Sequence, residues 1–194
     1  MQPVLSNRWG FSLLSALISL LAIGLFAFAT LIWQLPSVKI LKDTHFQAPL
    51  RVFTQQGDLI AEFGEKQRLP VSLEAIPPKL VQAVLSTEDQ RFYQHNGVDM
   101  ISLLRAAHSL IITGEKRQGA STITMQVARN FFLSRNKTFL RKFREILLAI
   151  KLEQYLSKDE ILELYLNKIF FGMRAYGVKA AARNYYGKNL HALT

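Results

Sequence analysis

The sequence predicts a mainly α-helical protein with an N-terminal transmembrane helix and a small β-hairpin. Residues 11–33 carry no charged side chain, and a helix of about 20 mostly apolar residues can cross a bilayer. Downstream, apolar residues recur at helical spacing in segments bounded by capping residues. We expect four parts: a cytoplasmic tail at 1–10, a transmembrane anchor at 11–35, a linker with the hairpin at 36–75 and one helical domain at 76–194.

A cleaved signal peptide is the competing interpretation of the N-terminal run. Arg8 precedes the run, and Ala27-Phe28-Ala29 has the small-x-small form of a cleavage site. The apolar residues nevertheless continue through Trp33, which makes the run longer than the ~7–15 residues of a signal-peptide core. We therefore favour an uncleaved anchor with Trp33 at the membrane interface.

Charge counting says little about orientation. The tail carries only Arg8, whereas Lys39, Lys42 and Arg51 follow the run, and this count alone would keep the large domain in the cytoplasm. Long domains translocate largely regardless of charge, so the count does not decide the side.

The globular part is strongly basic along one stretch. The chain has 24 Lys and Arg against 14 Asp and Glu, and no Cys, which excludes disulfides and thiolate chemistry. From Lys116 through Lys151 there are nine basic residues and one carboxylate, Glu145. This run predicts a polyanionic partner: nucleic acid, anionic lipid headgroups or a pyrophosphate.

Turn and capping signals place the expected elements. Leu50–Thr54 and Leu59–Phe63 flank Gln55–Asp58, which is typical of a hairpin. The first expected helix runs from Pro77-Pro78 to Glu88, and the second from a cap at Asp99 to Gly114. A third helix begins at a cap at Ser121, and a fourth runs from a cap at Thr138 to about Leu156. A fifth begins at a capping box of Ser157 and Glu160, and the last runs from about Gly177 to Tyr186 and stops at Gly187. In the helix after Thr138 we expect these side chains to face inward: Phe139, Phe143, Ile146, Leu147 and Ile150.

The first tract that carries chemistry is Glu88-Asp89-Gln90-Arg91-Phe92-Tyr93-Gln94-His95-Asn96-Gly97. Glu88 lies where a helix ends, so the negative end of the helix dipole, with partial burial by Phe92, would raise its pKa. A raised pKa suits a general base near neutral pH. The plainer alternative is a solvated pair of carboxylates at a helix end, with His95 as an ordinary turn histidine.

The second tract is Gly119-Ala120-Ser121-Thr122-Ile123-Thr124-Met125-Gln126. Its helix places polar residues on one face, opposite an apolar stripe; the polar set is Thr122, Gln126, Arg129 and Asn130. Such a stripe is often only solvated surface. Beside a helix N-terminus, however, a hydroxyl, an amide and a guanidinium also form an anion-binding face.

The third tract is Arg141-Lys142-Phe143-Arg144-Glu145. As a surface pair at i and i+4, Arg141 and Glu145 would contribute only ~0.3–0.5 kcal/mol to the helix. Glu145 is, however, the only carboxylate among nine cations, which favours a specific role.

These tracts, in this order, resemble the motifs of peptidoglycan glycosyltransferases, family 51, found at the front of class A penicillin-binding proteins of the 1A type. Lys158–Asn167 and Gly172–Lys188 resemble the two remaining motifs, so the resemblance covers about residues 40–194. It implies an α-helical, lysozyme-like, two-lobed domain with a membrane-facing apolar jaw near Phe131–Phe143. The family's domain normally continues further, so we expect an N-terminal fragment with an incomplete catalytic domain and no transpeptidase domain.

The resemblance also implies residue roles. Glu88 matches the catalytic base, and Glu145 is expected to join it in the cleft as a second catalytic carboxylate. Arg141 and Lys142 would neutralise a departing pyrophosphate. The implied substrate-binding residues are Asp89, Phe92, His95, Ser121, Thr122, Gln126, Arg129, Asn130, Arg141 and Lys142. The last two motifs are interpreted mainly as scaffold, with Arg174 and Lys188 as further candidate phosphate contacts.

The implied reaction is the polymerisation of lipid II into β-1,4-linked glycan, with inversion and release of undecaprenyl pyrophosphate. The implied partners are lipid II, the growing glycan strand, the lipid bilayer and other cell-wall synthesis proteins, with no nucleic acid. No cofactor is required and no metal ligands are predicted, although a divalent cation near the first carboxylate pair is compatible with the resemblance. The implied location is the bacterial inner membrane, crossed once, with the catalytic domain in the periplasm.

Three other classes of function remain open. A lysozyme-like muramidase or lytic transglycosylase could also use Glu88, but it would have no need of a cationic pyrophosphate site. A nonenzymatic membrane scaffold explains the anchor and leaves Glu88, Gln126 and Glu145 without a purpose. Nucleic-acid binding explains only the basic stretch. Ser134-Arg135-Asn136-Lys137 fits the Ser-x-x-Lys form of penicillin-binding transpeptidases by chance, since its partner motifs are missing.

Overall fold

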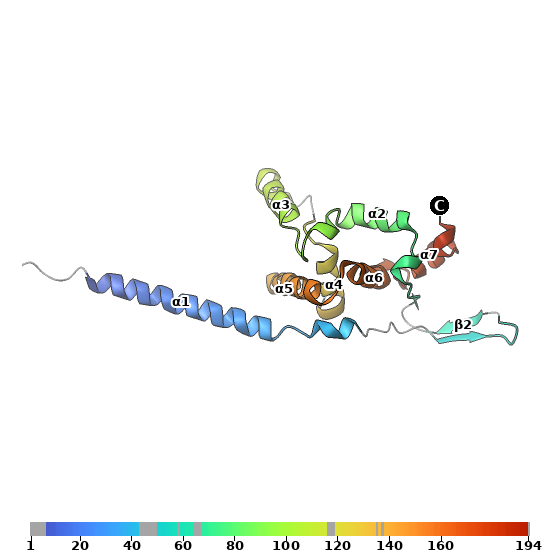
Figure 1. The fold of residues 1–194 in the computed structure, drawn as a ribbon, viewed down its shortest axis with the longest axis horizontal. Coiled ribbons are helices and arrows are strands. Elements are labelled where there is room, and N and C mark those ends of the chain that lie inside the picture. Colours follow the sequence, from blue (N-terminus) through green and yellow to red (C-terminus); the bar gives the residue numbers. More distant parts are fainter. Residues whose placement is uncertain are drawn as a thin grey trace, which may run out of the picture. The chain divides into compact units, whose positions relative to one another are not determined.

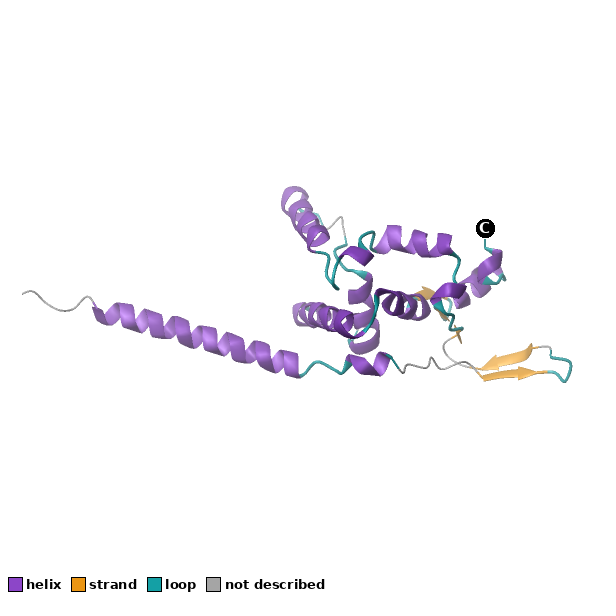
Figure 2. Ribbon diagram, in the orientation of Figure 1, coloured by secondary structure: helices purple, strands orange, loops and turns teal. Residues whose placement is uncertain are grey.

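The protein was analysed as a computed structural model that describes residues 7–42, 50–57, 59–63, 67–115, 119–134, 136 and 138–193. The chain divides into two compact units at the Pro36–Ser37 bond. Figures 1 and 2 show that helices dominate, with a small share of strand, so the predicted mainly α class is confirmed. The lysozyme-like, two-lobed arrangement and the four-part division stay predictions. Most of the predicted tail, the turn residue Asp58 and the basic residues Lys116, Arg117, Arg135 and Lys137 lie outside the described residues.

Helix α1, Asn7–Trp33, accounts for the apolar N-terminal run. At ~1.5 Å per residue, its 27 residues are longer than the hydrocarbon core of a bilayer, which is about 30 Å thick. It is the one helix among the described residues with the length and composition to cross a membrane. Its last residue, Trp33, is exposed, as an interfacial aromatic residue would be.

The predicted hairpin is present. Strands β1, Leu50–Phe53, and β2, Leu59–Phe63, pair antiparallel with Val52 opposite Ala61. The register shifts between Val52 and Phe53, where the paired ladder is irregular.

Helices α2, Pro78–Glu88, and α3, Met100–Thr113, begin and end where the sequence predicts. The Asp99 carboxylate accepts from the backbone N–H groups of Ile101 and Ser102 and so caps α3. Gly114 ends α3 in the left-handed conformation.

Helix α4, Ile123–Phe132, begins one residue later than predicted. The N-cap is Thr122, whose hydroxyl accepts from the N–H of Met125, so the prediction of Ser121 as the cap is wrong. Both hydroxyl residues suit an N-cap, and the sequence does not distinguish them. The shift leaves the Ser121 hydroxyl available for a contact with another helix.

Helix α5, Phe139–Tyr155, is capped by Thr138 as predicted but turns a different face inward. Its fully buried residues are Glu145, Leu148, Ala149 and Leu152. Phe139, Phe143 and Ile150 are exposed and Ile146 and Leu147 only half-buried, so the predicted inward face is wrong. The buried face includes a carboxylate, which a hydropathy pattern assigns to solvent.

Helix α6, Lys158–Lys168, starts with the predicted capping box of Ser157 and Glu160. Helix α7, Val178–Tyr186, ends at Gly187, and Ala180 and Ala182 are buried in close packing as expected. A three-stranded sheet of order β3-β5-β4 was not predicted; its strands are β3, Gln67–Arg68, β4, Phe170–Gly172, and β5, Ala175–Tyr176. Strands of two or three residues are too short for an alternating pattern to show. The described short 3₁₀ helices are η1, Val38–Leu41, η2, Leu73–Ala75, η3, Phe92–Gln94, and η4, Leu190–Ala192.

Helix α4 packs against both α5 and α6 and is the centre of the core. Its fully buried Ile123 and Val127 belong to the same core as Leu148 of α5 and Leu162 of α6. This packing places the polar residues of α4 beside the C-terminal end of α2.

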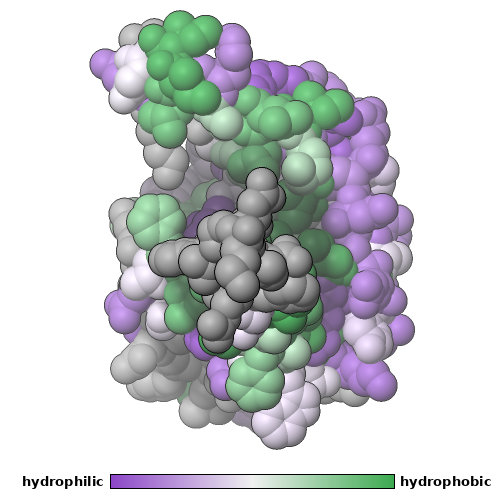
Figure 3. Space-filling model, turned by 90° about the vertical axis from the view of Figure 1, so that its left-hand side faces the viewer, coloured by the Kyte–Doolittle hydropathy of each residue, from purple (hydrophilic) through white to green (hydrophobic). Residues whose placement is uncertain are grey.

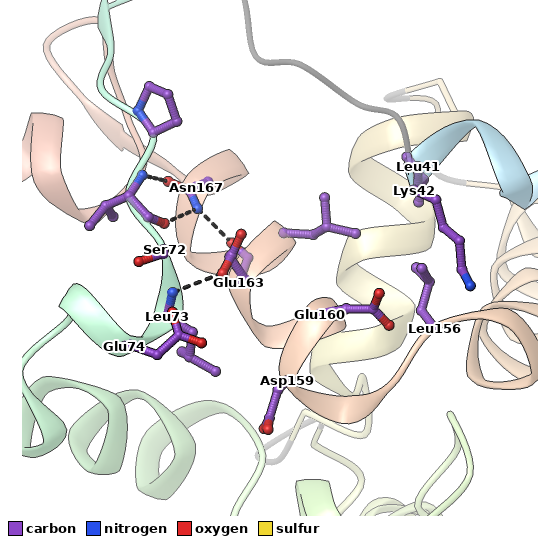
Figure 4. A pocket seen from close by; sticks show the side chains of 13 residues that line it. Leu41, Lys42, Ser72, Leu73, Glu74, Leu156, Asp159, Glu160, Glu163 and Asn167 are labelled. Atoms are coloured by element: carbon purple, nitrogen blue, oxygen red, sulfur yellow. Dashed lines mark hydrogen bonds between the residues drawn. The ribbon is translucent and has the colours of Figure 1, made fainter.

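A hollow with a volume of about 560 Å³ lies against α6. Figure 4 shows how two of its polar side chains are hydrogen-bonded: Asn167 exchanges two hydrogen bonds with the Val71 backbone, and Glu163 accepts from the N–H of Leu73. These bonds fasten the segment before α2 to α6, which supports the interpretation of the fourth motif as scaffold.

The backbone of Gly97 lies very close to that of α5. Its φ is +85°, and a Cβ there would lie 2.8 Å from the backbone carbon of Ala149 in α5. We expect Gly97→Ala to destabilise the domain by about 2–4 kcal/mol, because it combines a left-handed backbone with overpacking. Urea unfolding measures the effect. The control is Gly114→Ala, where φ is +66° in open space and the cost should be about 1 kcal/mol. Equal losses at the two sites would contradict the close approach.

Candidate active site

Glu88 is the last residue of α2, and its carboxylate is exposed. Gln126 Nε2 of α4 donates to Glu88 Oε2 at 2.8 Å, and Arg129 Nη2 donates in turn to Gln126 Oε1 at 3.5 Å. The expected partial burial of Glu88 by Phe92 is wrong, because Phe92 is itself packed into the core. Glu88 is thus an accessible carboxylate whose orientation is fixed from α4.

Asp89, the next residue, is buried and joins three segments. His95 Nε2 lies 3.0 Å from each Asp89 carboxylate oxygen, and the N–H of Ile123 donates to Oδ2 at 3.0 Å. The carboxylate therefore ties the end of α2 to the first residue of α4. His95 Nδ1 is buried without a hydrogen-bond partner among the described residues.

The polar stripe of α4 divides into two roles. Thr122 is buried, and its hydroxyl donates to the carbonyl of Gly97 at 2.6 Å while capping α4. Its geometry is that of a structural contact. Gln126 and Arg129 are half-buried and Asn130 is exposed, so these three are open to a substrate.

Glu145 lies fully buried in α5 and binds two cations. Arg141 Nη1 donates to Oε2 at 3.0 Å, and Lys142 Nζ donates to Oε1 at 2.7 Å. Lys142 Nζ also donates to Ser121 Oγ at 2.8 Å. Because Glu145 is buried, its pair with Arg141 is not the weak surface ion pair that the sequence left open. Glu145 instead holds both cations in fixed positions. With no exposed surface, its geometry favours a positioning role, and its predicted catalytic role stays a prediction.

Ser121 connects the cationic group to Glu88. A polar cavity of about 130 Å³, the Glu88 cavity, is lined by both Glu88 and Ser121. Glu88 and the Arg141–Lys142–Glu145 group, predicted from separate tracts, therefore meet at Ser121. The sequence predicted each part and did not predict this link.

Tyr165 of α6 is a residue whose surroundings the sequence did not reveal. It was interpreted as core, and it is buried. Its hydroxyl has no hydrogen-bond partner among the described residues. Burial, then the negative charge of Glu88, raises the pKa of Tyr165, while Arg129 opposes the shift. Tyr165 and Glu88 line the same mainly apolar cavity of about 230 Å³. Helical spacing marks a tyrosine as core and cannot show what its hydroxyl faces.

Two further predicted contacts lie elsewhere in the described chain. Arg174 is exposed in the turn between β4 and β5, with φ of +61°, and Lys188 is exposed just after α7. Neither lines the Glu88 cavity, and both stay predictions. The described residues contain no group of three or more His, Asp or Glu side chains that could hold a metal ion.

Comparisons with known proteins point to one family. Residues 56–194 match the family model described as Transglycosylase. The chain is 56% identical over 161 residues to penicillin-binding protein 1A of Escherichia coli (strain K12). This alignment covers 83% of this chain and 19% of that protein. It is 49% identical over 182 residues to penicillin-binding protein 1A of Haemophilus influenzae; this alignment covers 94% of this chain and 20% of that protein. The chain thus spans about a fifth of the length of these curated relatives.

A crystal structure of penicillin-binding protein 1A from Haemophilus influenzae also matches. It is 32% identical in the aligned part and covers 78% of this chain and 13% of that one. The TM-score is 0.36, too low to support an argument from shape.

Glu145→Gln should destabilise the domain by about 2–4 kcal/mol, because Arg141 and Lys142 lose the negative charge that compensates them. Lys142 is 38% exposed, and solvent screening keeps the cost below that of a fully buried pair. Chemical unfolding in detergent measures it. Lys142→Gln is the control, expected to cost about 1 kcal/mol since Arg141 still binds the carboxylate. If Glu145→Gln lowers the free energy of unfolding no more than the control does, the carboxylate does not hold the two cations in place.

Proposed function

Because the chain belongs to the transglycosylase family, we propose that it is a membrane-anchored peptidoglycan glycosyltransferase that polymerises lipid II into β-1,4-linked glycan strands. One observation carries the proposal. An accessible carboxylate, Glu88, lines the same cavity as Ser121, whose hydroxyl binds the cation Lys142. A base for an attacking hydroxyl and a cation for an anionic leaving group are therefore adjacent.

Glu88 acts as the general base in this proposal. It removes the proton from the 4-hydroxyl of the acceptor's N-acetylglucosamine, and that oxygen attacks the anomeric carbon of the donor's N-acetylmuramic acid. The bond from this carbon to the pyrophosphate oxygen breaks, and undecaprenyl pyrophosphate leaves with the electron pair. Attack opposite the leaving group inverts the anomeric carbon. Gln126 holds the carboxylate in place through its 2.8 Å hydrogen bond.

Arg141 and Lys142 stabilise the leaving group. Glu145 fixes both side chains, so little reorganisation is needed as negative charge develops on the pyrophosphate. Lys142 remains partly exposed, which gives a phosphate oxygen access to its ammonium group. In this proposal Glu145 acts through the two cations rather than on the sugar.

A muramidase or lytic transglycosylase is the second candidate. Most glycosidases place two carboxylates across the scissile bond. Here Glu88 is exposed, whereas Glu145 is fully buried and bound to two cations, so it is not positioned as a partner carboxylate. Soluble muropeptides from purified sacculi, with no polymer from lipid II, would favour the hydrolase.

We also propose that α1 spans the bacterial inner membrane once, with the catalytic domain on the periplasmic side, and that α3 lies against the bilayer. Large apolar side chains of α3 are exposed, namely Met100, Ile101, Leu104, Leu110, Ile111 and Ile112. In Figure 3, hydrophobic side chains gather at the top of the face shown, the height at which α3 lies in Figure 1. The sequence predicted an apolar jaw near Phe131–Phe143 instead; there Phe139 and Leu140 are exposed, and that prediction remains untested.

The proposed reaction requires no cofactor, since proton removal and charge neutralisation are assigned to side chains. A divalent cation remains compatible with it, and a loss of rate with a chelator that added Mg²⁺ or Mn²⁺ reverses would reveal one. The proposed partners are lipid II, the growing strand, the bilayer and other cell-wall synthesis proteins, and we expect no binding of nucleic acid.

Glu88→Gln should lower the rate of polymerisation by about 10²–10⁴, because the amide keeps the shape of the side chain and cannot accept the proton. Gel analysis of polymer made from fluorescent lipid II measures the rate. Glu74→Gln removes an exposed carboxylate on η2 and should leave the rate unchanged. Unaltered polymerisation by the Glu88 variant would refute the assignment of the base.

The chain contains no Cys, so single cysteines can report the proposed contact of α3 with lipid. A polarity-sensitive dye on Ile111→Cys should shift to the blue in liposomes and be quenched by nitroxides on the lipid tails, because Ile111 is exposed and apolar. The control is the same dye on Arg183→Cys of α7, where neither change is expected. Matching spectra at the two sites would exclude membrane contact by α3.

A further inference from the structure

Tyr165 carries a buried hydroxyl that packing of the core does not explain. The side chain lies on α6 with 1% of its surface exposed, and its hydroxyl has no hydrogen-bond partner among the described residues. A buried hydroxyl without a partner lowers the stability of a domain, whereas a phenylalanine would fill the same space without this cost. The hydroxyl therefore points to a role other than packing.

The surroundings of this hydroxyl combine an apolar cavity with two opposite charges. Tyr165 and Glu88 line the same cavity of about 230 Å³, the Tyr165 cavity. The charges that act on the hydroxyl are those of Glu88, at the end of α2, and of Arg129 on α4. Because the lining is mostly apolar, the field of these charges is screened less than in open solvent. The remaining residues that line the cavity are Ala83, Val84, Thr87, Leu166, Ile169 and Phe171.

The two charges determine how the hydroxyl is oriented. Its hydrogen turns about the C–O bond, and no acceptor among the described residues holds it elsewhere. The orientation of lowest energy points the hydrogen toward the Glu88 carboxylate and the oxygen toward the Arg129 guanidinium. Burial and the charge of Glu88 raise the pKa of Tyr165 while Arg129 opposes the shift, so the hydroxyl stays protonated near neutral pH. Tyr165 thus presents the positive end of a dipole to Glu88 and is not a second base.

The other polar groups near Glu88 act on it from outside the Tyr165 cavity. Gln126 donates to Glu88 Oε2 at 2.8 Å, and Arg129 donates in turn to Gln126 at 3.5 Å. None of the charged residues that line the Glu88 cavity together with Glu88 also lines the Tyr165 cavity; they are Asp89, Arg91, Asp99 and Arg105. Gln126 therefore fixes one oxygen of the carboxylate, and Tyr165 acts on it from the apolar cavity.

We propose that Tyr165 is a positioning residue for the general base, and that its hydroxyl favours the ionised, proton-accepting form of Glu88. This inference rests on the proposed glycosyl transfer and adds a residue that the proposed reaction does not use. Tyr165 acts through Glu88 and does not touch the substrate. When the carboxylate takes the proton of the attacking hydroxyl, that proton stays on Glu88, and Tyr165 keeps its own.

Tyr165→Phe removes only the hydroxyl and keeps the ring that fills the core. Polymerisation of fluorescent lipid II in detergent, followed across pH, gives a profile of kcat/KM whose acidic limb reports protonation of the base. We expect this limb to move to higher pH by about 0.5–1 unit, because the ionised form loses a favourable dipole; kcat/KM at low pH then falls about three- to tenfold. Above the limb, where Glu88 is ionised in both proteins, kcat/KM should agree within about twofold.

Tyr93→Phe is the matched control, because it also removes a single hydroxyl. That hydroxyl donates to Asp159 at 2.9 Å, and Tyr93 lines neither the Tyr165 cavity nor the Glu88 cavity. The acidic limb should stay in place in this variant. In thermal unfolding, Tyr93→Phe should melt at a lower temperature because it loses a hydrogen bond, whereas Tyr165→Phe should melt at the same temperature as the unmodified protein or higher.

An acidic limb that does not move in Tyr165→Phe would overturn the inference. So would a loss of kcat/KM of equal size at every pH, or a melting temperature below that of Tyr93→Phe, because either result would assign the hydroxyl to a structural contact.

A titration that needs no activity separates this inference from the proposed function. In protein labelled with ¹³C at the glutamate carboxyl groups, the signal that disappears in Glu88→Gln identifies Glu88, and its change with pH follows protonation. If the unmodified protein makes no polymer, the glycosyltransferase proposal fails, and the ¹³C titration still shows whether Tyr165→Phe favours protonation of Glu88. If the unmodified protein is active and neither the limb nor the titration moves in Tyr165→Phe, only the role of Tyr165 is refuted.

Discussion

The arrangement of the candidate active site depends on the buried carboxylate of Asp89. It accepts hydrogen bonds from the His95 ring and from the first N–H of α4, so three separate segments meet at one charged group. A carboxylate out of water is stable only when such donors surround it. This requirement brings the end of α2 against the start of α4. Glu88, the neighbouring residue, is then left exposed within reach of Gln126.

A second buried carboxylate fixes the other half of the site. Glu145 lies on the inward face of α5, where a charge would be costly without Arg141 and Lys142. Lys142 also connects α5 to α4, because its ammonium group donates to the Ser121 hydroxyl at the start of α4. The close approach of Gly97 to α5, with Thr122 bonded to the Gly97 carbonyl, sets how near α4 and α5 can lie. Contacts at the N-terminal end of α4 therefore position both halves of the site.

The sequence predicted elements with local signals and missed what depends on tertiary contacts. The caps at Asp99, Thr138 and Ser157 and the stop at Gly187 are local, and each is confirmed. The inward face of α5 was wrong because Glu145 is buried by two cations, which no hydropathy pattern includes. The α4 cap was misplaced because Ser121 and Thr122 are equally suited to the cap position, and the contact between Ser121 and Lys142 cannot be read from the local sequence. The surroundings of the Tyr165 hydroxyl, which include Glu88 and Arg129, arise from residues distant in sequence.

The different exposure of the two glutamates is the strongest argument for transfer to a lipid-linked substrate rather than hydrolysis. A hydrolase of the common type needs both carboxylates at the sugar, one to protonate the leaving oxygen and one to act on the opposite side. A pyrophosphate leaving group needs no protonation of that kind; it needs positive charge held in place. Of these two glutamates, Glu88 is accessible, whereas Glu145 is bound to the cations that would provide this charge. One exposed base with a fixed cationic pair is therefore the arrangement expected when a hydroxyl displaces a pyrophosphate.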